Sequence, residues 1–185
     1  MHKDFWNQGG LYSWGKNHYG QLGLGDVQHR SSPVQLGSLT NWKSVGGHGF
    51  NLYGIKTDLS LWSWGNNTYG QLGLGDVQHR SSPVQVGSLT NWKSVNCGGY
   101  HICAIKVDGT LWSCGSNSNG KLGLGDIDPR SSPTQVGSLT DWKTISCGRN
   151  YSAAIKTDGT LWGWGINTYG TLGLEDIIPV LLQFK

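Results

Sequence analysis

Hydrophobic and polar positions alternate over short stretches of the chain. In LWSWG, residues 61–65, Trp62 and Trp64 fall on one face of an extended strand and Ser63 on the other, which is the pattern of a half-buried strand. Three further stretches have the character of strands: SPVQVG at 82–87, entered through a proline that suits a first strand position, NWKSV at 91–95 and YHICAIK at 100–106. The loop between the first two is rich in glycine and lacks apolar periodicity. The pattern predicts an all-β chain.

This pattern recurs with a period of fifty residues. LYSWG begins at residue 11, LWSWG at 61, LWSCG at 111 and LWGWG at 161, and residues 19–35 are identical to residues 69–85. Asp108-Gly109 and Asp158-Gly159, which precede two of these stretches, are strong hairpin signals. The first repeat has Asp58-Leu59 there, so we expect a less well formed turn.

Repeats of this size predict a β-propeller, because one four-stranded sheet cannot bury both faces alone and stacking the sheets removes their tryptophans from water. We expect four-stranded antiparallel blades, about three and a half per chain, in a partial or composite ring. The expected blades are residues 11–60, 61–110 and 111–160 with a half repeat at 161–185, all in one structural domain. Residues 1–10 form a lead-in that can supply an extra strand.

Composition narrows the function classes. Thirty glycines among 185 residues favour strands and turns over helices, and the net charge of +3 is too small to argue for a nucleic-acid partner. No stretch is long enough to span a bilayer, and the N-terminal residues lack the apolar run of a signal peptide. We expect a soluble protein, cytoplasmic by default or part of a virion or cell-surface assembly; the location itself is unknown.

Candidate chemistry is sparse. The spacings of the four cysteines match neither a zinc site nor a disulfide framework, so we expect free buried thiols, no metal and no cofactor. His29 and His79 lie beside serines, but the third repeat has Pro129 there, and we expect solvated loop histidines and no enzyme activity. Aspartate and arginine recur four residues apart, which predicts ion pairs. Two lysines also recur in each repeat, which predicts either a rim of mixed charge or two basic arcs.

The segments LWSWGNNTYGQLGLGD, SPVQV and WKSVNCGGYHICAIKVDGTLW resemble the regulator of chromosome condensation repeat. The resemblance covers residues 11–185 and implies a β-propeller, which in complete members of the family usually has seven blades. The eponymous member is a nucleotide exchange factor that uses a protruding hairpin, and no insertion interrupts the even spacing here. The family histidine stands only at His101, with Asn51 and Tyr151 in its place elsewhere.

Otherwise similar repeats diverge abruptly at the turn between the third and fourth strands. On a propeller these turns gather on one face, so we predict a binding surface there, formed by His48, Phe50, Tyr100, His101, Arg149, Asn150 and Tyr151. Aromatic and arginine side chains are enriched in binding hot spots. Repacking of inner-strand residues is the alternative explanation.

The predicted function is a non-catalytic scaffold or protein-interaction module, as in a structural or adhesive component of a larger bacterial or viral assembly. The alternative, which the resemblance suggests, is a guanine-nucleotide-exchange or chromatin-docking regulator. The half repeat ends in apolar residues that predict an interface with another copy of the chain or a different subunit: Ile177, Ile178, Val180, Leu181 and Leu182.

Overall fold

The computed structural model describes residues 10–38 and 40–173, and these form an all-β structure. One short 3₁₀ helix, η1 (Ser118–Gly120), interrupts the loop after β9. The described strands are β1 (Tyr12–Gly15), β2 (Arg30–Gln35), β3 (Trp42–His48), β4 (Asn51–Lys56), β5 (Leu61–Gly65), β6 (Arg80–Gln85), β7 (Trp92–Cys97), β8 (His101–Lys106), β9 (Leu111–Gly115), β10 (Arg130–Gln135), β11 (Trp142–Cys147), β12 (Tyr151–Lys156) and β13 (Leu161–Gly165).

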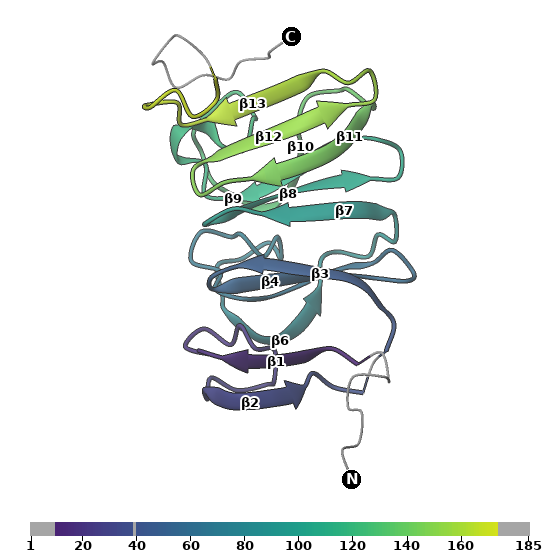
Figure 1. Ribbon diagram of the computed structural model, residues 1–185, viewed down its shortest axis with the longest axis vertical. Helices are drawn as coiled ribbons and strands as arrows, with labels where there is room; N and C mark the ends of the chain where they lie inside the picture. The colour runs from purple at the N-terminus through teal and green to yellow at the C-terminus, as the bar shows by residue number, and fades with distance from the viewer. Residues whose placement is uncertain (1–9, 39, 174–185) are drawn as a thin grey trace.

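The strands form antiparallel sheets that follow one another along the chain (Figure 1). Two sheets have four strands, β3-β4-β5-β6 and β7-β8-β9-β10, while β1-β2 and β11-β12-β13 form smaller sheets among the described residues. The edge strand β7 contacts β3 of the preceding sheet and β11 of the following one. The predicted propeller of about three and a half blades is therefore confirmed, and the described sheets do not close into a ring.

The sheets are out of phase with the sequence repeats. Each four-stranded sheet takes its first two strands from one repeat and its last two from the next, so the sheets span residues 42–85 and 92–135 and not the predicted 11–60, 61–110 and 111–160. The reason is the connections: a tight turn joins β4 to β5 and keeps them in one sheet, whereas the segment between β2 and β3 carries the chain to the next sheet.

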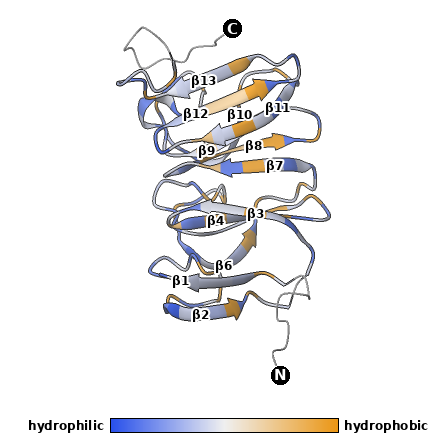
Figure 2. Ribbon diagram, in the orientation of Figure 1, coloured by the Kyte–Doolittle hydropathy of each residue, from blue (hydrophilic) through white to orange (hydrophobic). Residues whose placement is uncertain are grey.

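The central strands are buried on both faces. The pattern indicated a half-buried strand with Ser63 on the face opposite the tryptophans. The Ser63 side chain is fully buried, and its hydroxyl donates a hydrogen bond of 2.8 Å to the Leu72 carbonyl oxygen. Strand β5 lies between β4 and β6 within its sheet, and neighbouring segments cover both faces. Apolar residues lie in strands such as β8 and β12 and also in the loops, where Leu22, Leu72 and Leu122 are buried (Figure 2).

Tryptophan pairs pack at the same place in each repeat. Trp92 and Trp112 meet edge to face at 6.2 Å between ring centroids, and the ammonium of Lys106 lies 3.5 Å from the Trp112 centroid. Lys56 and Lys156 are stacked in the same way on their own tryptophan pairs and are also buried. These three lysines therefore do not form one of the two basic arcs that the sequence suggested.

The turn at Asp58-Leu59 keeps the geometry of its counterparts. Leu59 adopts the left-handed conformation, with φ at 65°, and its amide donates to the Lys56 carbonyl at 2.9 Å. Gly109 makes the equivalent bond at 3.0 Å. The turn was expected to be less well formed, but its hydrogen bond is intact, and the conformational strain falls on a leucine.

Candidate functional site

The turns that differ most between repeats gather on one face of the stacked sheets. The turns β3–β4, β7–β8 and β11–β12 lie on the left in Figure 1, together with the long loops that follow β1, β5, β9 and β13. The pairing of His101 with Gly115 places the start of a long loop directly beside the β7–β8 turn. We call this side of the molecule the turn face.

Aromatic side chains of the turns pack on aromatic side chains of the long loops. Phe50 meets Tyr19 edge to face at 5.5 Å, and Tyr100 meets Tyr69 in the same way at 5.3 Å. We call these four residues the aromatic row. Phe50 is 40% exposed and Tyr69 is 46% exposed, so the row presents apolar surface to solvent. Tyr19 and Tyr69 were not among the predicted residues, although both belong to the identical segment that the first two repeats share.

The structure brings six of the seven predicted binding residues to the surface of this face. His48, Phe50 and Arg149 are exposed, and Tyr100, Asn150 and Tyr151 are half-buried. His101 is fully buried and therefore unsuited to contact a partner directly. The predicted interface residues Ile177, Ile178, Val180, Leu181 and Leu182 lie outside the described residues.

His101 links two neighbouring sheets. Its Nε2 lies 2.8 Å from the hydroxyl of Ser152, and that hydroxyl donates to the Lys121 carbonyl oxygen at 2.9 Å. Burial, and to a smaller extent the charges of Lys121 and His48, lowers the pKa of His101 to about 3. The imidazole is therefore neutral at physiological pH.

The side chain of Lys121 is also buried beneath the turn face, which sequence reasoning missed. Gln21 and Gln71 occupy the same position in the first two repeats, so the departure from the repeat was the available signal. The Nζ of Lys121 lies 3.4 Å from the Asn150 Oδ1. Burial and the charge of Arg149 lower the pKa of Lys121.

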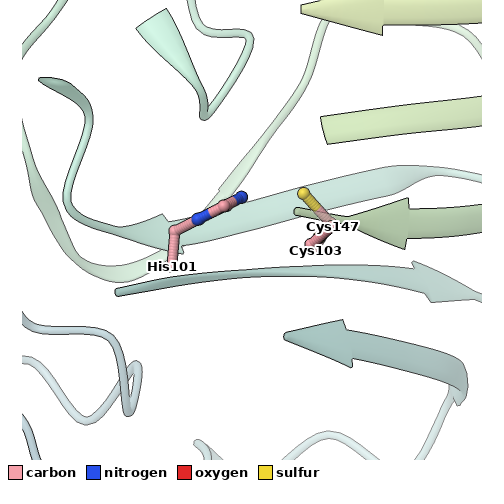
Figure 3. A group of neighbouring side chains, drawn as sticks. All are labelled: His101, Cys103 and Cys147. Carbon is pink, nitrogen blue, oxygen red and sulfur yellow. The ribbon is translucent and has the colours of Figure 1, made fainter. Parts of the chain in front are cut away.

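All four cysteines are free thiols, as predicted, and they gather in the interior. Cys103 and Cys114 are buried, and Cys97 and Cys147 are half-buried. Burial raises the pKa of Cys97 and of Cys114 above the ordinary thiol value. Cys103 and Cys147 lie beside His101, and the ligand atoms of the three residues fall within 4.8 Å of one another (Figure 3).

The recurring Asp–Arg pairs and His79 stabilise the long loops. Asp76 pairs with Arg80, and the equivalent pairs form in the repeats before and after, so the predicted ion pairs are confirmed. The backbone amide of Gln78 is the main cause of the lowered pKa of Asp76. His79 accepts a hydrogen bond of 3.0 Å from the Asn67 amide, so this histidine braces the loop although it is exposed.

Two equivalent pockets lie away from the turns, between successive sheets. The first, of about 460 Å³, is lined by Trp42, Lys56 and Trp62, and the second, of about 440 Å³, by Trp92, Lys106 and Trp112. Each lysine is stacked on its tryptophans. The pockets therefore present apolar surface around a cation that already has a partner, and we assign them no ligand.

Solved structures with the same fold are substantially larger proteins. The structure of Kap60 bound to yeast RCC1 (Prp20) matches 96% of this chain and 45% of the other chain, with 24% identity and a TM-score of 0.81. Human WBSCR16 matches 92% of this chain and 46% of its own, with 28% identity and a TM-score of 0.80. The chain thus spans less than half the length of these proteins. No curated protein matches the sequence closely.

Family models match most of the chain. The model of the regulator of chromosome condensation (RCC1) repeat matches residues 8–50, 60–105 and 108–155, and a second model with the same description matches residues 92–121 and 142–171. Among the described residues, no helix is long and apolar enough to cross a membrane. The repeats found in the sequence and the stacked sheets agree with these matches, and the chain belongs to the family of RCC1 repeat proteins.

Proposed function

We propose that this chain is a non-catalytic protein-interaction module that binds its partner through the turn face. The observation that carries the proposal is the aromatic row, in which Phe50 and Tyr69 remain 40% and 46% exposed although the ring pairs already pack on each other. Tyrosine, tryptophan and arginine dominate binding hot spots because they bury a large area and also form hydrogen bonds.

Charge on the same face favours a partner with acidic groups. Arg149 is exposed, and the buried ammonium of Lys121 lies beside Asn150 directly beneath this part of the surface. The charge of Arg149 contributes to the lowered pKa of Lys121, so the two cations lie close together. A carboxylate of a partner placed here would offset two positive charges.

Proteins with the same fold also bind proteins. Yeast RCC1 (Prp20) has been crystallised bound to Kap60, and a second structure of Prp20p is described together with its binding to Gsp1p and histones. These identities of 24% and 23% carry the fold alone, so the partner of this chain is a separate question. We propose a scaffold role within a larger assembly, with the aromatic row and Arg149 as the contact.

The test compares variants in quantitative affinity capture from extracts of the organism that encodes the chain, followed by titration of the purified partner. The variant Tyr69→Ala/Tyr100→Ala/Arg149→Ala removes the contact, and Val107→Ala is a matched control because Val107 is 56% exposed at the opposite end of β8. We expect a partner that wild type and control retain and that the triple variant binds at least tenfold more weakly, as loss of about 1.4 kcal/mol implies. Equal binding by all three proteins would refute the assignment.

The alternative function is nucleotide exchange or chromatin docking, as the family resemblance suggests. Its support is the fold match to Prp20p, whose description names Gsp1p and histones. A direct measurement is the release of a fluorescent guanine nucleotide from a small GTPase in the presence of this chain. The scaffold proposal predicts no acceleration, and a catalysed release would replace it.

A further inference from the structure

We propose that His101, Cys103 and Cys147 form a binding site for a thiophilic d¹⁰ metal ion, Zn²⁺ or Cu⁺, which joins two neighbouring blades. The three ligand atoms lie within 4.8 Å of one another, and the imidazole points toward the cysteine side chains (Figure 3). This proposal does not depend on the function proposed above.

The donor set selects the class of metal. Thiolate sulfur and imidazole nitrogen suit Zn²⁺ and Cu⁺, whereas Ca²⁺ and Mg²⁺ require oxygen ligands. Two cysteines and one histidine are also the protein ligands of one known class of three-ligand zinc site. His101 and Cys103 stand two residues apart on β8, so their side chains share one face of the strand, and Cys147 reaches them from β11 of the next sheet.

Two of the three ligands are shielded from solvent, and the third, Cys147, is half-buried. His101 is fully buried and Cys103 is 1% exposed. The Nδ1 of His101 has no hydrogen-bond partner among the described residues. The nitrogen that faces the cysteines is the other one: Nε2 approaches the Ser152 hydroxyl, which lies near both sulfurs, so Nε2 is the atom that would bind the ion.

A serine hydroxyl lies among the three ligand atoms. The Oγ of Ser152 is 2.8 Å from His101 Nε2, 3.6 Å from Cys103 Sγ and 3.9 Å from Cys147 Sγ. All three side chains therefore approach this atom. The Ser152 side chain is small and can rotate away from Nε2. Its hydroxyl now occupies the space between the three ligand atoms, and rotation would leave that space for the ion.

The cluster lies between β8 and β11 of neighbouring sheets, and the first repeat lacks its counterpart. Asn51, Leu52 and Tyr53 replace His101, Ile102 and Cys103 in the first repeat, and Tyr53 fills the corresponding space with its ring. The serine of the cluster, Ser152, likewise stands where the other repeats have leucine and isoleucine. The family histidine at His101, Cys103 of the same strand and Cys147 of the next repeat thus meet at one point.

The experiment uses the whole chain without a histidine tag, reduced and then freed of metal and excess reductant under anaerobic conditions. Zn²⁺ affinity is measured by competition with a chromogenic chelator, and Cu⁺ affinity by competition with bicinchoninate. We expect one equivalent of at least one of the two ions to bind, with the melting temperature raised in its presence because the ion joins two sheets. Absence of binding by both ions would overturn the proposal.

Matched variants identify the ligands. Cys103→Ser and Cys147→Ser each remove one sulfur with little change in volume, and we expect each to weaken binding more than the roughly 10–100-fold that loss of an outer-shell partner costs. Cys97→Ser and Cys114→Ser are the controls, since these cysteines lie outside the cluster, and we expect unchanged affinity. Circular dichroism and the melting temperature of each metal-free variant establish folding. Full affinity in both ligand variants, or equal loss in the controls, would refute the assigned ligand set.

Discussion

The packing of each long loop on the next sheet can be tested with a single methyl group. Gly70 has φ at +76°, and an added Cβ would lie 2.5 Å from the Cα and 2.8 Å from the Cβ of Ser131 in the following sheet. Gly75, in the same loop, has φ at +85°, but an added Cβ would meet only the Ser132 Oγ at 3.7 Å. Gly70→Ala and Gly75→Ala therefore share the backbone strain and differ in the contact between blades.

The magnitude follows from these two terms. A left-handed alanine costs about 1–2 kcal/mol, and this term is the same in both variants. Forcing a methyl group into a packed contact adds about 1–3 kcal/mol, which only Gly70→Ala pays because Ser131 meets it with main-chain atoms. For a chain of this size each kcal/mol lowers the melting temperature by about 2–4 °C, so the two variants are expected to differ by roughly 2–12 °C.

The assay is urea unfolding followed by tryptophan fluorescence and by circular dichroism, with thermal melting as a second measure. The two optical probes must report the same transition, since repeat arrays can lose all-or-none unfolding. We expect Gly70→Ala to be the less stable variant by both measures. Equal destabilisation within about 0.5 kcal/mol, the usual spread of surface substitutions, would show that the loop does not pack against the next sheet as described.

Three further predictions concern single side chains. Tyr53→Phe leaves a buried side-chain amide and a buried main-chain carbonyl without the hydroxyl that they contact, so unfolding experiments at pH 7 should show a loss of about 1–3 kcal/mol. Burial raises the pKa of Tyr53, so the unfolded chain loses the hydroxyl proton at a lower pH than the folded chain does. The stability of the wild type therefore falls as the pH rises above about 10. The same unfolding experiments should show a smaller loss at alkaline pH for Tyr53→Phe. Leu59→Gly relieves the left-handed conformation at φ 65°, and the relief of about 1–2 kcal/mol exceeds the glycine penalty of about 0.5–1 kcal/mol. The net gain is about 0.75 kcal/mol at the midpoints, which should raise the melting temperature by about 1.5–3 °C. Asn117→Asp places a carboxylate where the amide now donates to Asp126 at 2.9 Å. We expect urea unfolding to show that the free energy of unfolding falls by about 2 kcal/mol or more. Asn119→Asp, at an exposed position, should change it little.

The fold was accessible from the sequence because its signals are local and repeated. The period of fifty residues, the alternation in LWSWG and the Asp-Gly turns each report short-range geometry, and every copy reinforces the others. The same signals could not place the sheet boundaries. Each sheet combines strands from two repeats, and that choice depends on which connection is a tight hairpin and which crosses to the next sheet.

The sequence also located the turn face, because turns at equivalent positions of stacked sheets must lie side by side. It could not tell which of those residues face solvent: Phe50 lies in the aromatic row, whereas His101 is fully buried between sheets. Burial is set by neighbours that come from another repeat, here Ser152 and Lys121. For the same reason the spacing of the cysteines gave no sign of the cluster of His101, Cys103 and Cys147. By itself the sequence determined a stack of antiparallel blades, since periodicity is a property of neighbours along the chain, and only the tertiary structure decided which side chains meet between blades, since that depends on how one sheet is placed against the next.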